Sequence, residues 1–206
     1  MDVNGVMAVL QAMSRRMATE KDFLTQLDNE IADGDHGINM ARGFAAVEKK
    51  LPELAGKDVG TILKTTGMTL VSAVGGSAGP LYGTAFLKSG MAMTGKTEIS
   101  LDAFLDCLKV AIEGVQQRGR AVRGEKTMLD AMIPALEAMT AARTSGDDAK
   151  AVLSAGIAAA REGVEFTKTI AATKGRASYI GERSIGHQDP GATSFTFLLE
   201  AISTCL

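Results

Sequence analysis

Apolar residues recur at intervals of three and four along nearly the whole chain, and this periodicity constrains the fold more than any other feature. Val3, Val6, Leu10, Met13 and Met17 form one such stripe. This spacing places side chains on one face of a helix, whereas a half-buried strand requires strict alternation of apolar and polar residues. No segment gives a convincing alternating run. The sequence therefore predicts an all-α protein.

Eight amphipathic segments can be delimited from the periodicity together with turn and capping residues. The first begins near Val3 and continues to Asp28, and the second ends near Pro52. The other six begin near Asp58, Leu81, Ser100, Thr127, Asp147 or Asp148, and Pro190. The stretch 174–188 has no regular pattern. Short links predict eight helices in an antiparallel up-and-down bundle or closed barrel, and 206 residues suit a single domain.

Alternating helix direction brings four distant loops to one end of such an assembly. These loops are the aspartate-rich stretch 28–40, the glycine-rich stretch 75–80, the basic link 118–124 and the polar stretch 176–189. Together they contain carboxylates, glycines, hydroxyls and arginines. We therefore expect the functional site in the loops at this end.

Three aspartates, Asp28, Asp33 and Asp35, fall within eight residues of one another. Helical spacing cannot bring them together, because residues five and two apart do not share a helix face. Backbone turns at Gly34 and Gly37 would allow the three carboxylates to converge. Like charges so placed repel one another unless a hard divalent cation lies between them, and Mg²⁺ suits such a site best. An ordinary surface turn remains the alternative.

Two other functions of this stretch are excluded by its residues. A calcium-binding EF-hand loop needs an acidic residue at its twelfth position, which is Phe44 or Asn39 in the two possible registers. An aspartyl-phosphate phosphatase would place its nucleophile after a buried strand. Here Leu24, Leu27 and Ile31 have helical spacing instead.

The glycine-rich stretch 75–79 precedes a helix and contains Ser77, so it can present backbone N–H groups and a hydroxyl to a phosphate. It lacks the Lys-Ser/Thr ending of a P-loop. The stretch 189–194 is a similar candidate. A helix–helix turn and a capped helix start are the plain alternatives. In combination with the carboxylates and arginines, these loops favour a nucleotide diphosphate bound with Mg²⁺.

Composition excludes several classes of partner. The net charge is −2 and aromatic residues make up 4% of the chain with no tryptophan, so no nucleic-acid partner is expected. No apolar run approaches the ~20 residues of a membrane span, and the first residues lack a signal-peptide pattern, which predicts a cytoplasmic protein without membrane contact. Cys107 and Cys205 are too few for a disulfide framework.

Three motifs resemble the nucleotide-binding subunits of dihydroxyacetone kinases, the DhaL family, in the family order and across nearly the whole chain. They are Asp28-x-x-Ile31-x-Asp33-x-Asp35-His36-Gly37-x-Asn39-Met40-x-x-Gly43, the stretch Gly75 to Thr84, and Asp189-Pro190-Gly191-Ala192-Thr193-Ser194. The resemblance implies an eight-helix barrel with ADP and two Mg²⁺ ions at one end, and Asp28, Asp33 and Asp35 as the metal ligands. It implies nucleotide contacts from His36, Gly37, Ile38, Asn39, Ser77, Ala78, Gly119, Met128, Arg176, Asp189, Pro190 and Gly191.

The family has two kinds of member. One is fused to a dihydroxyacetone-binding domain and uses ATP, and the other stands alone and keeps ADP as a cofactor. The length of this chain favours the second kind, which depends on phosphoenolpyruvate. Phosphate would pass from a phosphohistidine of a DhaM-like partner to ADP, and then to dihydroxyacetone on a DhaK-like partner. Two copies of this chain forming a homodimer is a further expectation. The alternative is a non-catalytic nucleotide-dependent relative on the same barrel that binds a regulator or a lipid.

Overall fold

The computed structural model describes residues 1–206 and contains nine α-helices and two 3₁₀ segments, without any β-strand. The α-helices are α1 (Val3–Thr19), α2 (Lys21–Ile31), α3 (His36–Lys50), α4 (Val59–Ala73), α5 (Ala78–Ala92), α6 (Leu101–Gly119), α7 (Leu129–Thr144), α8 (Ala149–Thr167) and α9 (Pro190–Ser203). The 3₁₀ segments are η1 (Leu51–Leu54) and η2 (Arg176–Ser184). The all-α prediction is confirmed.

In addition to α1, which the Asp2 carboxylate caps, four helices begin at a side-chain cap that satisfies a backbone N–H group of the first turn. The Asp58 carboxylate accepts from Thr61 N at 3.1 Å and the Ser100 hydroxyl from Ala103 N at 3.1 Å. Asp148 and Asp189 cap α8 and α9 in the same way, at 2.9 and 2.6 Å. The predicted starts of these four helices are therefore confirmed.

Three other boundaries differ from the prediction. The first long helix is divided at Glu20, where the backbone leaves the helical region (φ −91°, ψ 6°), so α2 is a helix of its own. Helix α5 begins at Ala78 rather than near Leu81, because a proline is tolerated in the first turn and Pro80 lies there. Helix α7 begins at Leu129, which is one residue later than a cap at Thr127 implies.

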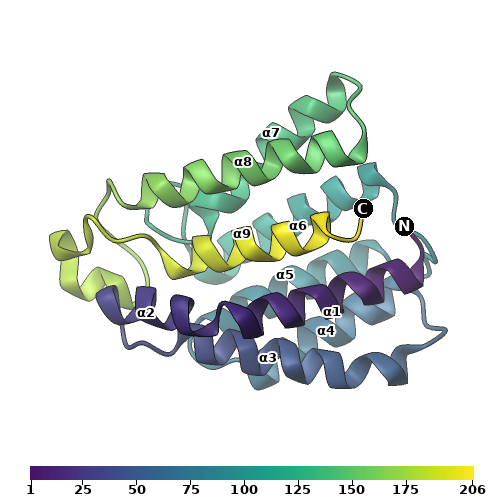
Figure 1. Cartoon of the computed structure of the whole chain (residues 1–206), viewed down its shortest axis with the longest axis horizontal. Helices are drawn as coiled ribbons and strands as arrows, with labels where there is room; N and C mark the ends of the chain where they lie inside the picture. The colour runs from purple at the N-terminus through teal and green to yellow at the C-terminus, as the bar shows by residue number, and fades with distance from the viewer.

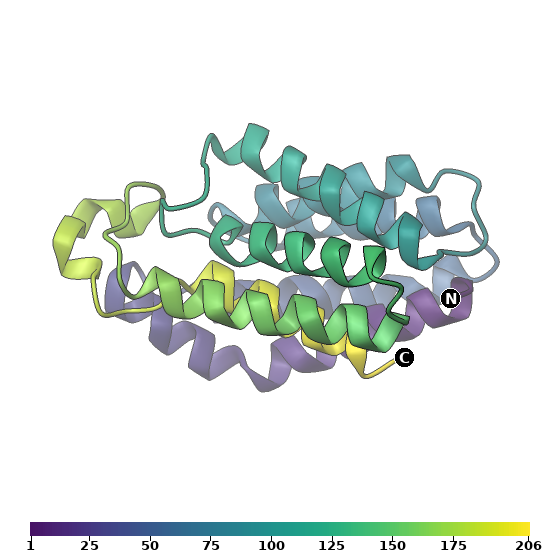
Figure 2. The same cartoon turned by 90° about the horizontal axis from the view of Figure 1, so that it is seen from above.

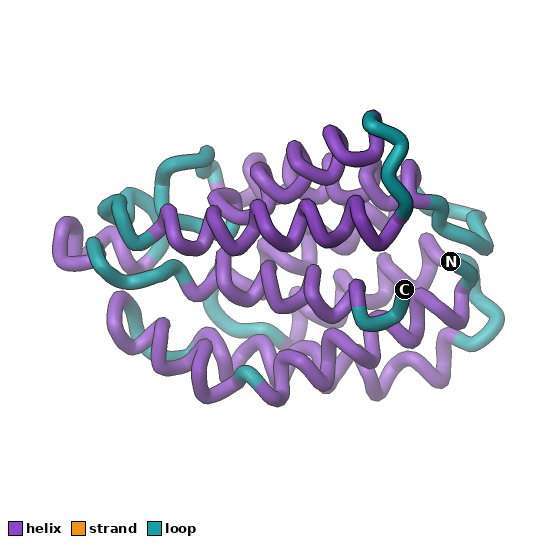
Figure 3. Tube along the Cα trace, turned by 45° about the horizontal axis from the view of Figure 1, so that its top comes forward, coloured by secondary structure: helices purple, strands orange, loops and turns teal.

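The helices pack in a cyclic order. Each helix from α3 to α9 contacts the next one along the chain, and α1 contacts both α3 and α9. The four polar loops gather at the left end of the molecule in Figure 1, and both termini lie toward the opposite end. The view from above and the trace coloured by structure show the same separation (Figures 2 and 3). None of the helices combines the length and apolar character required to cross a lipid bilayer.

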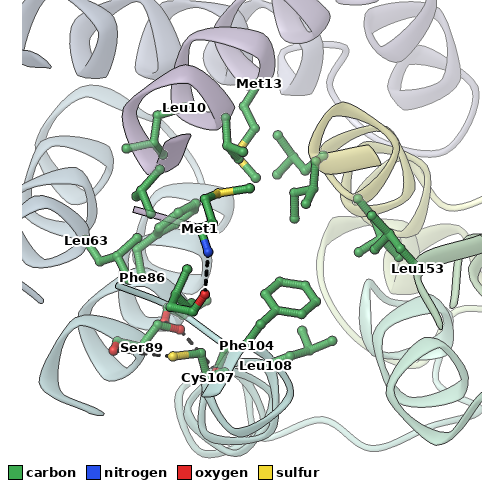
Figure 4. Close-up of a pocket in the computed structure, with 18 of the residues that line it drawn as sticks. Met1, Leu10, Met13, Leu63, Phe86, Ser89, Phe104, Cys107, Leu108 and Leu153 are labelled. Carbon is green, nitrogen blue, oxygen red and sulfur yellow. Dashed lines mark hydrogen bonds between the residues drawn. The ribbon is translucent and has the colours of Figure 1, made fainter. Parts of the chain in front are cut away.

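The interior is a connected apolar cluster to which every α-helix contributes. It is not completely filled, because a cavity of about 270 Å³ remains among the helices. Met1, Leu10, Met13, Phe86 and Phe104 are among the side chains around it (Figure 4). The Met1 amino group donates a hydrogen bond to the Ile99 carbonyl at 3.0 Å, which fixes the N-terminus there.

Candidate functional site

The loops after α2, α4, α6 and α8 enclose a polar pocket of about 500 Å³. All but two of the residues predicted for the site line this pocket. The two exceptions are Gly37, which is buried against α2, and Ile38, which is 49% exposed. The structure thus brings together four segments of sequence that are spread between Asp28 and Gly191.

The carboxylates of Asp28, Asp33 and Asp35 converge as the sequence predicts. One oxygen atom from each lies within 4.8 Å of the others. Asp28 belongs to the last turn of α2 and is buried, whereas Asp33 is exposed and Asp35 is half-buried. Three carboxylates at this spacing match the oxygen donor set that Mg²⁺ prefers.

The loop reaches this shape through one glycine turn rather than two. Gly34 has a φ of +69°, a region that L side chains rarely adopt. Gly37 does not form a turn, contrary to the prediction, but lies in the first turn of α3. A Cβ atom there would lie 2.0 Å from the Lys21 carbonyl oxygen, so glycine is required for the close approach of α2 and α3.

Asp28 also organises the backbone of the loop. Its Oδ2 atom accepts hydrogen bonds from Asp35 N at 2.8 Å and from His36 N at 3.1 Å. These donors belong to the start of α3, where a negative charge is favoured by the helix dipole. The bonds leave the second carboxylate oxygen of Asp28 available for a cation.

His36 takes part in a hydrogen-bonded chain that the sequence analysis did not detect. Its Nε2 atom lies 2.9 Å from Ser194 Oγ, which in turn lies 2.8 Å from the Tyr82 hydroxyl. Tyr82 also donates to the Gly191 carbonyl at 3.3 Å. Burial lowers the pKa of His36, and the charges of Asp28 and Asp35 act in the opposite direction. The chain connects the aspartate loop, α5 and the start of α9.

The glycine-rich loop contributes the start of α5. Ser77 lies at the N-cap position without capping the helix through its side chain, and both Ser77 and Ala78 line the pocket. Helix N-termini favour anionic groups. Asn39 lies beside this loop, and its carboxamide oxygen accepts from Arg42 at 2.6 Å.

Arg176 lies on η2 and forms an ion pair with Asp33. A guanidinium at the rim of the pocket can pair with a carboxylate or with a phosphate in a bidentate manner. The second histidine, His187, does not line the pocket, and its Nδ1 atom lies 2.9 Å from a Glu30 oxygen.

Two buried acidic residues lie at the starts of α7 and α9, and of the two Asp189 lines the pocket. The Asp130 carboxylate accepts hydrogen bonds from Gly124 N at 2.5 Å and from Thr127 N at 2.8 Å. These two bonds fix the loop before α7. Burial raises the pKa of Asp189 to about 7, and the Ala192 N–H bond opposes this rise. The buried Lys126 lines the pocket but was not predicted as a site residue, because a single charged residue in a loop carries no periodic or motif signal.

The chain matches the model of the DAK2 domain over residues 30–204. It is 45% identical over 186 residues to the PEP-dependent dihydroxyacetone kinase, ADP-binding subunit DhaL, of Escherichia coli K12, covering 90% of this chain and 89% of that protein. It is 40% identical to the PTS-dependent counterpart of Lactococcus lactis, covering 94% and 92%. The chain therefore belongs to the DAK2 domain family, and within that family to the DhaL subunits of dihydroxyacetone kinases.

Longer proteins contain a similar region. The chain is 31% identical to the L-erythrulose 1-kinase of Mycolicibacterium smegmatis but covers only 34% of it. Among solved structures, the dihydroxyacetone kinase of C. freundii matches with a TM-score of 0.75 at 23% identity, over 97% of this chain and 34% of that one. This likeness shows that the two share the helical fold.

Proposed function

We propose that residues 1–206 form a single domain that acts as the ADP-binding subunit of a phosphoenolpyruvate-dependent dihydroxyacetone kinase. The convergence of three carboxylates within 4.8 Å, in one pocket with Ser77 and Arg176, is the observation that carries this proposal. The identity of 40–45% to DhaL subunits, over about nine-tenths of their length, supports the stand-alone kind of member.

The donor set of Asp28, Asp33 and Asp35 fits Mg²⁺, because three carboxylate oxygens leave coordination positions for water and phosphate. Two Mg²⁺ ions are proposed here, and when bound they would neutralise charge on the β- and γ-phosphates. Asp28 is held in place by its two backbone hydrogen bonds. Asp33 needs to exchange its ion pair with Arg176 for a metal ion.

The nucleotide would lie between the α5 start and the α9 start. Ser77 and the first amides of α5 would orient the phosphates, and Arg176 would pair with them once it leaves Asp33. His36 to Asn39, Gly119, Met128 and Asp189 to Gly191 are the other proposed contacts. Catalysis on this chain is then positioning and charge stabilisation rather than covalent chemistry.

The proposed reaction moves one phosphoryl group twice. The group would pass from a phosphohistidine of a DhaM-like partner to the terminal phosphate of bound ADP, and from there to a hydroxyl of dihydroxyacetone on a DhaK-like partner. We assign no triose-binding residue and no base for the hydroxyl to this chain. The cytoplasmic location and a homodimer remain predictions.

Two measurements test this proposal. Mass spectrometry under native conditions should find ADP and Mg²⁺ retained by the gently purified protein. Mixed with both partners and phosphoenolpyruvate, the protein should support phosphorylation of dihydroxyacetone. Alone with excess ATP it should not phosphorylate the triose at a useful rate, and rapid phosphorylation by the isolated protein would refute the stand-alone role.

One observation favours the alternative of a lipid-binding relative. The cavity of about 270 Å³ inside the bundle is lined almost entirely by apolar side chains (Figure 4). If the protein were a pure binding module of this kind, extraction of the purified protein with organic solvent would release bound lipid. It would also fail to support triose phosphorylation with both partners present, which separates it from the kinase subunit.

A further inference from the structure

Lys126 is the most deeply buried basic side chain of the protein, and the sequence motifs do not account for it. It is 1% exposed and lies in the loop between α6 and α7. Its backbone φ of 60° falls in the left-handed region, which non-glycine residues occupy only when the surroundings hold them there. Both features indicate that the fold places this one side chain at some energetic cost.

The ammonium group of Lys126 bonds only to one segment of the chain. It donates to the backbone carbonyl oxygens of Thr167, Ile170 and His187. A lysine ammonium has three donors, so all of them are used. The three acceptors lie at the end of α8, just after it, and just before α9. Lys126 therefore holds both ends of the segment 168–189.

The other ties between the loop 120–128 and this segment are weaker. Thr173 N donates to the Glu125 carbonyl at 3.3 Å, and the Thr173 hydroxyl to the Glu125 carboxylate at 3.3 Å. Lys174 lies 3.8 Å from Glu125 as a partly exposed ion pair, a kind that contributes little. The buried bonds of Lys126 are therefore the main connection.

The segment 168–189 carries two of the proposed nucleotide contacts. Arg176 lies in its middle, and Asp189 is its last residue. Asp189 N donates to the Thr167 hydroxyl at 2.9 Å, next to a carbonyl that Lys126 holds. Burial lowers the pKa of Lys126, and the charges of Asp189 and Asp130 act in the opposite direction. Movement of the Lys126 side chain would therefore displace the wall that includes Asp189.

A purely structural role explains these observations less well. Transfer of an ammonium group from water into a protein interior is costly, and a methionine would fill a similar volume without that cost. A methionine side chain, however, cannot donate hydrogen bonds to the three carbonyl oxygens. The cation is therefore suited to holding loops that have little apolar packing of their own.

We propose that Lys126 is a positioning residue, whose ammonium group holds the segment 168–189 against the loop 120–128 and thereby determines how long a bound nucleotide is retained. The part of this inference that concerns retention rests on the proposed ADP-binding function. The part that concerns the segment does not, so it can be tested in nucleotide-free protein.

The test compares Lys126→Met with Lys168→Met. Lys168 begins the same segment, but its ammonium bonds only to the Glu165 carboxylate and lies outside the pocket. Hydrogen exchange by mass spectrometry, without nucleotide, should show at least tenfold faster exchange of 168–189 in Lys126→Met. The dissociation rate of ADP with Mg²⁺ should rise at least tenfold in the same variant. Lys168→Met should match the wild type in both measurements.

The proposal is overturned if ADP dissociation from Lys126→Met stays within twofold of the control, or if exchange rises equally across all helices. Circular dichroism checks that the helices persist. If Lys126→Met does not fold, Lys126→Gln keeps hydrogen-bond donors without the charge and is judged by the same two measurements. If wild-type protein binds no ADP, the proposed function fails, whereas the exchange comparison still decides whether Lys126 holds the segment.

Discussion

The Nε2 atom of His36 lies 2.9 Å from the hydroxyl oxygen of Ser194, although the two residues are 158 positions apart in the chain. Ser194 also bonds to the buried Tyr82 hydroxyl, so its side chain connects α3, α5 and α9. Through this contact Ser194, which is not one of the predicted nucleotide contacts, orients His36, which is one of them.

Ser194→Ala should weaken ADP binding about fivefold, because the His36 ring loses the hydrogen bond that orients it. The buried Tyr82 hydroxyl also loses a partner, so we expect the free energy of unfolding to fall by about 1–3 kcal/mol. Calorimetric titration with ADP and thermal unfolding measure the two effects. Ser203→Ala is the matched control, since it removes an exposed hydroxyl from the same helix. Equal ADP affinity in both variants would contradict the orienting role.

Asp35→Asn should abolish phosphoryl transfer, and so should Asp33→Asn, with the helical fold intact. We expect a loss of at least about a hundredfold, because changes beyond the direct ligands of a metal already cost 10–100-fold. Without Mg²⁺ the variants should be as stable as the wild type or more so, since one of three crowded charges is gone. Asp22→Asn, on the exposed side of α2, is the control. Near-normal turnover of Asp35→Asn would rule out the metal assignment.

Arg176→Lys should lower ADP affinity about tenfold, equivalent to about 1.4 kcal/mol, because lysine keeps the charge but loses the bidentate fork. Calorimetry with Mg²⁺ present measures the change. Arg183→Lys alters an exposed arginine of the same 3₁₀ segment and should leave the affinity unchanged. An Arg176→Lys protein that binds ADP as tightly as Arg183→Lys would show that the guanidinium does not contact the phosphates.

Gly67→Ala should lower the free energy of unfolding by about 1–3 kcal/mol, the usual effect of overpacking. A Cβ atom at Gly67 would lie 2.7 Å from the Gly83 carbonyl oxygen and 2.8 Å from Leu87 N, and both are backbone atoms of α5. Gly114→Ala is the comparison, because the atoms it meets are side-chain atoms of Lys88 and Thr84. Chemical denaturation should therefore show a smaller loss for Gly114→Ala, and the reverse order would contradict the close approach of α4 and α5.

Asp58→Asn should remove a pH-dependent part of the stability. Hydrogen bonds from the Thr61 hydroxyl and from the Gly95 and Thr61 N–H groups lower the pKa of Asp58 to about 2, from an ordinary value of 3.8. The carboxylate therefore contributes stability above pH 3.8, and this contribution is lost as the pH falls toward 2. Unfolding curves of the wild type and the variant should converge across that range. A difference between them that does not change with pH would contradict the lowered pKa.

Local physics in the sequence was sufficient for the fold class, most helix starts and the convergence of the three aspartates. Helical periodicity depends on neighbours three and four residues away, and caps such as Asp58 and Ser100 act within one turn. Asp28, Asp33 and Asp35 lie within eight residues, so one loop can bring them together. The motif resemblance, which compares whole segments, correctly identified the DhaL family.

The tertiary structure alone decided the contacts between distant residues. Lys126 bonds to carbonyl groups 41 to 61 positions away, Ser194 reaches His36 and Tyr82, and Arg176 pairs with Asp33. A backbone carbonyl or a lone hydroxyl leaves no pattern in a sequence, so its partner cannot be predicted from spacing. The break of the first helix at Glu20 and the close approach at Gly37 likewise have no local signal. These features follow from how the helices pack, because packing decides which polar groups lose water and must find a partner within the protein.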